Sequence, residues 1–325
     1  MRVVITGGAG FLGSRLAEAL RERGTLAAAY GTPADIDDIV LFDQPAAVAR
    51  LAAVPEGCSV VGGDIAGAAD VARLLGDGPV AVFHLASIVS GHGEQDFDLA
   101  LRVNLDGARR LLEACRTHPH PVRLTTTSSL AVFGPASGDP VGDDSLVQPA
   151  TTYGMTKAIL ELMINDYGRK GYVDGRAARL PTVVIRPGAP NAAASSAASG
   201  IFREPLAGRD FALPLPLETV MAVASVESVI DNLITLHELP GDALDGRRTV
   251  TFPSVSATFA EMLDVLHTQV PADHLPAVTV APDPAVQAIV AGWPTRVRGD
   301  RGLGLGLRRA DDLDTTLTAY RQRYV

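Results

Sequence analysis

The sequence predicts an α/β fold with a doubly wound parallel sheet, followed by a smaller C-terminal region. In the first half of the chain, short apolar segments alternate with segments whose apolar residues recur every three or four positions. This alternation is typical of parallel strands joined by crossover helices. A glycine-rich turn between the first strand and the first helix supports the same fold. With 325 residues, 47% of them hydrophobic, the chain can bury a large core.

Short apolar segments, mostly rich in β-branched residues, are predicted as strands. They are residues 3–6, 40–42, 59–61, 80–84, 123–127 and 176–180. Segments with helical periodicity are predicted to cross between them. They are residues 12–23, 70–75, 97–116 and 151–167. The segment 24–38 is longer than a usual connection from helix to strand, and we predict a surface loop with a partial turn.

The composition changes after Leu180, where Pro, Ala, Ser and Gly become frequent. We therefore expect residues 1–181 to form the sheet domain. Residues 182–325 are expected to form mainly a lid or substrate-binding region, from which segments at about 219–255 return to the sheet domain.

Charge and composition exclude several classes of partner. A net charge of -9 disfavours nucleic acid, because phosphate backbones are bound through clustered Lys and Arg. No apolar run is long enough to span a membrane, and the first residues do not resemble a signal peptide, so we expect a cytoplasmic protein. Cys58 and Cys115 lack the paired spacing of a metal site, and no metal is expected.

The glycine-rich turn has the features of a dinucleotide-binding loop. A predicted strand runs directly into Thr6-Gly-Gly-Ala-Gly-Phe-Leu-Gly13, and a predicted helix follows. Gly7 permits the sharp turn, Gly10 lets the backbone approach a pyrophosphate, and Gly13 lets the helix pack closely on the sheet. Unpaired amides at the start of the helix would face the anion. This combination predicts a Rossmann-type sheet that binds NAD or NADP.

Asp43 ends the second predicted strand and favours NAD over NADP. Its carboxylate would accept hydrogen bonds from ribose hydroxyls and repel a 2′-phosphate. The spacing from Gly13 is longer than the usual ~20 residues. Three other aspartates compete for the role, namely Asp35, Asp37 and Asp38. Arg15 favours NADP instead, because a basic residue near the loop could bind a 2′-phosphate.

A tyrosine and a lysine on one predicted helix form a candidate catalytic pair. Tyr153 and Lys157 are four residues apart and therefore lie on one face of the helix. An ammonium and an oxidised nicotinamide both favour phenolate, so Tyr153 could accept a hydroxyl proton. Ser128 and Ser129 end the preceding strand, where a serine hydroxyl could orient a substrate oxygen. The alternatives are an ordinary pair on a helix surface and a cap at a strand end.

These motifs, in this order, resemble the extended short-chain dehydrogenase/reductase family, also called the epimerase/dehydratase family, over nearly the whole chain. The resemblance implies that Ser129, Tyr153 and Lys157 are the active-site residues. It also implies that subunits pair into a homodimer through the two helices that carry Asn104 and Tyr153. The residues expected to contact or support NAD are Gly7, Gly10, Phe11, Leu12, Gly13, Asp43, Asp64, Ile65, Leu85, Ala86, Ser87, Asn104, Tyr153, Lys157, Leu180 and Pro181.

Within this family the sequence favours simple oxidation. Family members that dehydrate nucleotide sugars carry an acidic pair after the active-site Ser or Thr, where this chain has Leu130 and Ala131. Residues 151–176 and 179–208 are similar to those of the D-erythronate dehydrogenases. That similarity implies NAD-dependent oxidation of the 2-hydroxyl of D-erythronate, a short sugar acid, to 2-dehydro-D-erythronate.

The expected substrate contacts include the catalytic residues Ser129 and Tyr153 together with Thr182, for which the resemblance implies a place facing the substrate. Arg186 is the candidate for the substrate carboxylate, because a guanidinium can bind a carboxylate through two hydrogen bonds. Asn191 and Ser195 could hold hydroxyls. Two alternatives are a nucleotide-sugar 4-epimerase, whose pocket should be larger and basic, and a non-catalytic NAD-binding protein.

Overall fold

The computed structural model describes residues 1–51, 53–190 and 193–325, and its centre is a parallel sheet of seven strands. The strands are β1 (Arg2–Thr6), β4 (Asp38–Asp43), β5 (Cys58–Gly62), β6 (Val80–His84), β7 (Arg123–Ser129), β8 (Asp174–Leu180) and β12 (Thr249–Thr251). Their order across the sheet is β12-β8-β7-β6-β1-β4-β5, and every neighbouring pair is parallel. The predicted α/β class is confirmed, and each predicted strand lies within one of these seven.

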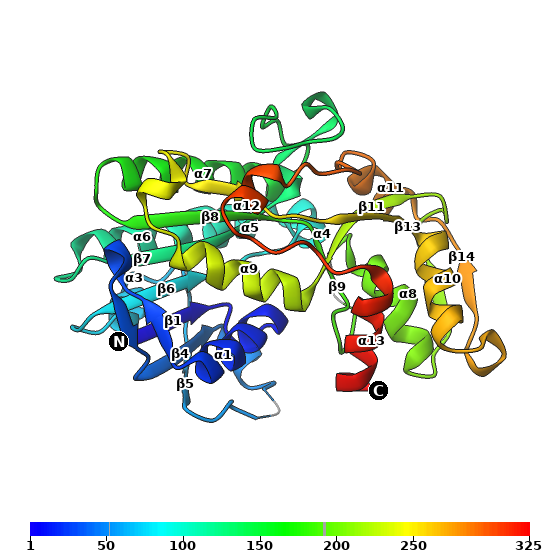
Figure 1. The fold of residues 1–325 in the computed structure, drawn as a ribbon, viewed down its shortest axis with the longest axis horizontal. Helices are drawn as coiled ribbons and strands as arrows, with labels where there is room; N and C mark the ends of the chain where they lie inside the picture. The colour runs from blue at the N-terminus through cyan, green and yellow to red at the C-terminus, as the bar shows by residue number, and fades with distance from the viewer. Residues whose placement is uncertain (52, 191–192) are drawn as a thin grey trace.

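Helices cover both faces of this sheet (Figure 1). One face is covered by α1 (Phe11–Arg23) and α9 (Val226–Glu238), and the other by α3 (Ala68–Leu74), α6 (Ala108–Thr117) and α7 (Thr152–Arg169). Side chains alternate between the two faces along a strand. In β1, Val3 and Ile5 accordingly pack under α1 and α9, whereas Val4 packs under α3, α6 and α7.

The strand order reverses beside β1. The chain runs outward from β1 through β4 and β5, and then returns to β6 on the other side of β1. In open α/β sheets, ligands bind in the crevice outside the carboxyl ends of the strands at such a point. The glycine-rich loop follows the carboxyl end of β1 and therefore lies at this crevice.

The segment 24–38, predicted as a surface loop with a partial turn, contains the turn but forms a small hairpin and not a loop. Strands β2 (Thr25–Ala27) and β3 (Pro33–Asp35) pair antiparallel around a short turn, η1 (Ala29–Gly31). The hairpin packs on α9, because the Ala27 amide donates to Glu238 at 3.0 Å and the Ala27 carbonyl lies 3.2 Å from His237 Nε2. Strands of three residues are too short for an alternation of apolar and polar residues to be recognised in the sequence.

The predicted helix over 97–116 is present but is not uniform. It consists of α5 (Phe97–Ala100), a π-helical segment, η2 (Leu101–Gly107), and α6. Three further short helices are α2 (Pro45–Val48), α4 (Ser90–Gln95) and α12 (Asp300–Gly304). No helix in the described part of the chain combines the length and apolar character needed to cross a bilayer.

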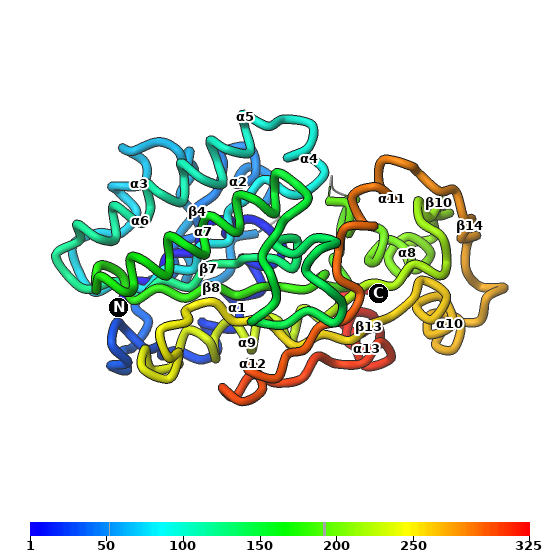
Figure 2. The backbone as a smooth tube through the Cα atoms, turned by 90° about the horizontal axis from the view of Figure 1, so that it is seen from above, coloured from blue at the N-terminus to red at the C-terminus, as the bar shows by residue number. Residues whose placement is uncertain are grey.

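The rest of the chain forms a second body beside the carboxyl ends of the strands (Figures 1 and 2). Its strands are β9 (Thr182–Val184), β10 (Phe211–Leu213), β11 (Val220–Ser225), β13 (Val255–Thr258) and β14 (Val278–Val280). They form a sheet in the order β13-β11-β9 and a separate pair of β10 with β14. Helices α8 (Ser196–Leu206), α10 (Phe259–Gln269), α11 (Pro284–Val290) and α13 (Leu313–Tyr324) enclose a further core with them.

Candidate active site

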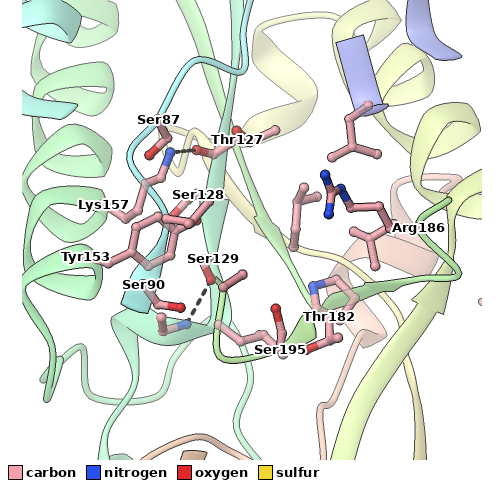
Figure 3. Close-up of a pocket in the computed structure, with 18 of the residues that line it drawn as sticks. Ser87, Ser90, Thr127, Ser128, Ser129, Tyr153, Lys157, Thr182, Arg186 and Ser195 are labelled. Atoms are coloured by element: carbon pink, nitrogen blue, oxygen red, sulfur yellow. Dashed lines mark hydrogen bonds between the residues drawn. The ribbon is translucent and has the colours of Figure 1, made fainter. Parts of the chain in front are cut away.

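A cavity of about 320 Å³ lies between the two bodies, at the carboxyl edge of the parallel sheet. Figure 3 shows that its lining comes from both: Tyr153 and Lys157 stand on one side, and Arg186 on the other. A second pocket of about 200 Å³ adjoins it and shares Gly7 and Gly10 with it. Together they form a groove that runs along the glycine-rich loop into the cavity.

The glycine-rich loop fits a pyrophosphate. Gly7 has φ +72°, and a Cβ there would lie 2.8 Å from the Ala86 amide nitrogen. A Cβ on Gly13 would lie 2.4 Å from the Gly7 carbonyl oxygen, so α1 can pack this closely only with glycine at that position. Helix α1 begins after Gly10, which has no side chain to cap it, and its first amides remain available for an anion.

Asp43 lies directly beside this loop. Its carboxylate accepts hydrogen bonds from the Ala9 amide at 3.1 Å and from the Gln44 amide at 2.8 Å. Burial raises the pKa of Asp43, and the two amides, Gln44 before Ala9, partly offset that rise. Asp43 lines the second pocket together with Asp64 and Ile65.

The competing residues around the loop have other partners. Asp37 binds the N-terminal ammonium, and Asp38 pairs with Arg2 at 3.3 Å. Arg15 pairs with Glu18 at 2.7 Å and with Glu227 at 3.5 Å. Asp35 belongs to the hairpin strand β3. Of the four aspartates, Asp43 is the one that lines the pocket beside the glycine-rich loop, and the charge of Arg15 is already compensated.

The three candidate catalytic side chains meet in the cavity (Figure 3). Tyr153 lies in the first turn of α7, which Thr151 caps by accepting the Gly154 amide at 3.0 Å. Lys157 Nζ lies 5.6 Å from the centre of the Tyr153 ring and donates to the Thr127 carbonyl at 2.8 Å. Ser129 ends β7, and its hydroxyl accepts the Ala131 amide at 3.1 Å.

Burial works against the charged forms of both Tyr153 and Lys157. It raises the pKa of Tyr153 to about 12, although a hydrogen bond with the Ser129 hydroxyl lowers that pKa in part. Burial lowers the pKa of Lys157 to about 8, and Glu161 acts in the opposite direction. Without a ligand, the pKa of the Tyr153 phenol therefore stays above its ordinary value. The nearby Lys157 ammonium is not sufficient to lower it. A further positive charge in the cavity would favour phenolate.

A buried ion pair fixes helix α7 behind these residues. The Glu161 carboxylate accepts hydrogen bonds from Arg179 at 2.9 and 2.8 Å and from the Ser128 hydroxyl at 2.5 Å. The Arg179 guanidinium also lies 4.9 Å from the centre of the Phe133 ring. Glu161 stands one helical turn after Lys157, so the helix is tied to both β7 and β8 at the point where they end.

Asn104 and His84 lie behind the wall of the cavity and are both satisfied. The Asn104 side chain accepts the Ile88 amide at 2.7 Å, and donates to the Ile88 carbonyl at 3.1 Å and to Thr156 Oγ1 at 3.2 Å. It thus joins the strand-end segment after β6 to α7. His84 is buried and lies 2.7 Å from Thr6 Oγ1, and burial lowers its pKa to about 3.

The candidate substrate contacts line the opposite side of the cavity, where Thr182, Arg186 and Ser195 are found. The Arg186 backbone is fixed: its amide donates to Ser199 Oγ, and its carbonyl accepts from Arg203, both at 3.0 Å. Its guanidinium donates to the Ala189 carbonyl at 3.0 Å. Burial, and then the nearby Arg203, lower the pKa of Arg186. Asn191, the remaining candidate, lies outside the described residues.

Sequence reasoning missed several residues that line the cavity. They are Val89, Ser90, Val183, Ala193, Val220, Met221, Ala222, Trp293 and Pro294. Ser90 begins α4, and its hydroxyl accepts the Ala194 amide at 3.3 Å. A serine soon after a strand end could have been suspected. Trp293 could not, because it follows Lys157 by more than a hundred residues and belongs to no motif of the parallel sheet.

Comparison with known proteins identifies relatives of nearly the full length of this chain. Residues 3–242 match the model of a family described as the NAD dependent epimerase/dehydratase family. The D-erythronate dehydrogenase of Cupriavidus necator is 42% identical and covers 98% of each chain, and that of Haemophilus influenzae is 40% identical and covers 95% of each. A solved structure described as the nucleoside-diphosphate-sugar epimerase from Agrobacterium tumefaciens is 33% identical, with a TM-score of 0.88 over 100% of this chain and 94% of that one.

We expect the free energy of unfolding to rise when the buried Lys157 is replaced by an uncharged residue. Its pKa is about 8 against an ordinary 10.5, which corresponds to a cost of up to about 3 kcal/mol. That cost is fully present below pH 8 and disappears as the pH rises through 10.5, because the folded state releases the proton first. Lys157→Met should therefore be more stable than the wild type at pH 7, and the difference should shrink by pH 10.

Urea denaturation at the two pH values measures this difference. The control is Lys170→Met, which removes an exposed lysine from the end of the same helix and should change little. A Lys157→Met protein less stable than the wild type at pH 7 would contradict the expected electrostatic cost.

Proposed function

Because the chain belongs to the NAD-dependent epimerase/dehydratase family, we propose that it oxidises the 2-hydroxyl of D-erythronate to give 2-dehydro-D-erythronate and NADH. Two full-length relatives carry the name D-erythronate dehydrogenase. The observation that carries the proposal is a small cavity with a tyrosine, a serine and a lysine on one side and an arginine on the other. That set matches a short acid with a hydroxyl next to its carboxylate.

The cofactor is NAD, and the residues present fit it. Gly7, Gly10 and Gly13 would hold the pyrophosphate, and Asp43 the adenosine ribose. Leu180 and Pro181 line the cavity and would lie against the nicotinamide. When bound, NAD supplies the acceptor for the hydride that leaves carbon 2 of the substrate.

The chain's own residues would handle the proton and the oxygen. Tyr153 accepts the proton of the 2-hydroxyl, while the Ser129 hydroxyl holds the same oxygen in place. The positive charge of Lys157 favours the phenolate form of Tyr153. Because Lys157 is buried and Tyr153 is half-buried, the charge of the lysine acts on the phenol with less screening than it would have at the surface.

Arg186 would bind the substrate carboxylate. A guanidinium can hold a carboxylate through two parallel hydrogen bonds, which fixes the orientation as well as the position of the acid. Ser199 and Arg203 hold the Arg186 backbone on both sides, so its side chain starts from a fixed point. The carboxylate at Arg186 would then turn the neighbouring 2-hydroxyl toward Tyr153.

Turnover of D-erythronate tests the proposal. We expect NADH to accumulate when the protein is given NAD and D-erythronate, and turnover to fall by about a hundredfold or more in Tyr153→Phe, since proton transfer by a positioned side chain contributes about that much. NAD affinity should stay within a few fold. Tyr172→Phe, which alters an exposed tyrosine, is the control. Full activity in Tyr153→Phe would overturn the mechanism.

Nucleotide-sugar epimerisation is the second candidate, because the Agrobacterium tumefaciens structure carries that description. The same three catalytic residues would serve it, but a nucleoside diphosphate needs more space. The cavity, at about 320 Å³, is at the lower end of the range for small-molecule sites and must also hold the nicotinamide. Turnover of a uridine diphosphate sugar, or stabilisation of the protein by a uridine nucleotide, would favour the epimerase.

The position of Asp43 predicts the cofactor preference. Asp43→Ala removes the carboxylate that would repel a 2′-phosphate, so kcat/KM with NADP should rise at least tenfold relative to NAD. Steady-state rates with the two cofactors measure this ratio. Asp38→Ala, which removes a nearby aspartate paired with Arg2, should leave the ratio unchanged. An unchanged ratio in Asp43→Ala would remove Asp43 from this role.

A homodimer in the cytoplasm is also part of the proposal. Two large apolar side chains on the expected interface helices are exposed: Leu162 on α7 is 72% exposed, and Phe97 on α5 is 53% exposed. Contiguous exposed apolar patches mark surfaces that bind another protein, and we propose that these two side chains belong to one such patch. A second copy of the chain would cover them.

The mass in solution tests the dimer. The wild type should sediment with twice the chain mass of 33.9 kDa, and Leu162→Glu should shift the protein toward the monomer, because a carboxylate in an apolar interface is costly. Val280→Glu, on the distant strand β14, should remain a dimer. A monomeric wild type would contradict the proposal.

A further inference from the structure

A segment from late in the chain, which includes Trp293 and Pro294, forms part of the lining of the cavity. Trp293 is the only tryptophan of the chain and is half-buried. We propose that Trp293 sets the length of the acid accepted, by forming the wall against which the far end of a four-carbon chain rests. This inference rests on the proposed function and adds the residue that limits its substrate.

The contacts of this segment are with the C-terminal body and with the loop before α7. Trp293 packs against the core of the C-terminal body, which includes Ala194 and Met221. On the other side, a Cβ at Gly292 would lie 3.5 Å from Ala150 Cβ and 3.9 Å from Pro135 Cδ, so the segment touches the loop that leads from β7 to α7. The wall therefore joins the body that carries Arg186 to the segment that leads into Tyr153.

Hydrogen bonds hold the segment in place. The Asp139 carboxylate accepts the Thr295 hydroxyl at 2.7 Å, the Arg296 amide at 2.8 Å and Arg296 Nε at 3.1 Å. Val141 bonds to the Arg296 carbonyl at 3.0 Å and to the Arg298 amide at 2.7 Å. Ser256 Oγ donates to the Thr295 carbonyl at 2.7 Å. These bonds fix the backbone two to five residues after Trp293, and before it the Trp293 amide donates to the Val290 carbonyl at 2.9 Å, so the backbone that carries the indole is held on both sides.

A fixed aromatic wall discriminates by length. A substrate held by Arg186 at its carboxylate and by Tyr153 at its 2-hydroxyl can extend only toward the remaining side of the cavity. Each excess carbon would then collide with the wall, and one carbon in a closely fitting pocket changes kcat/KM by about tenfold or more. The Trp293 indole nitrogen has no hydrogen-bond partner among the described residues, so phenylalanine can replace it without loss of a bond within the protein.

Substrate profiles of two variants test the wall. Rates are measured with D-erythronate and with five-carbon and six-carbon aldonates of the same configuration at carbons 2 and 3. The wild type should prefer D-erythronate to the six-carbon acid by at least tenfold. Trp293→Ala should reduce this preference at least tenfold, mainly through KM, whereas Trp293→Phe should retain most of it. Tyr30→Ala, at the exposed tip of the hairpin, should keep the wild-type ratio.

Fluorescence provides a second readout. Because Trp293 is the only tryptophan, D-erythronate added to the protein with NADH should change tryptophan emission, and Trp293→Phe serves as the blank. Turnover of D-erythronate with the same length preference in Trp293→Ala, or a wild type without a length preference, would overturn the inference alone. A wild type that oxidises none of the acids would overturn the proposed function and this inference with it.

Discussion

The cavity depends on how helix α7 is fixed to the ends of strands β7 and β8. Lys157 binds the Thr127 carbonyl, and one turn later Glu161 binds both Ser128 and Arg179. Two anchors one turn apart leave a rigid helix little freedom to rotate or slide. Tyr153, one turn before Lys157, is therefore fixed relative to Ser129. A buried ion pair of this kind adds little net stability compared with apolar packing, so we infer that its main contribution here is geometry.

Burial in the cavity changes the pKa values of Lys157 and Tyr153, and it also lowers the stability of the fold. Burial makes both side chains resist ionisation, and it moves their pKa values in opposite directions, down for Lys157 and up for Tyr153. In the proposed mechanism, the phenol of Tyr153 would become a base only when a second positive charge is present. Oxidised NAD would supply that charge when bound. Removal of the substrate proton would then be coupled to the presence of the hydride acceptor.

Much of the fold was predictable because the parallel sheet obeys local rules. Buried strands such as 80–84 show as apolar runs, and the turn from Gly7 to Gly13 shows as glycines that backbone contacts require. The hairpin at 24–38 was missed, since its strands are stabilised by α9 and not by their own sequence. The π-helical turn around Asn104 was also missed, because its residues have ordinary helical periodicity.

The division between predicted and unpredicted site residues has a physical origin. Cofactor and catalytic residues follow the ends of the parallel strands, so their order along the chain reflects their order in space. The proposed substrate wall comes from β9, β11 and the segment at Trp293, which line one cavity although they lie far apart in the chain. The contacts there, such as Asp139 with Arg296, join residues more than 150 positions apart. The proposed catalytic residues thus follow from local motifs, whereas the proposed choice of substrate depends on tertiary contacts that no local motif encodes.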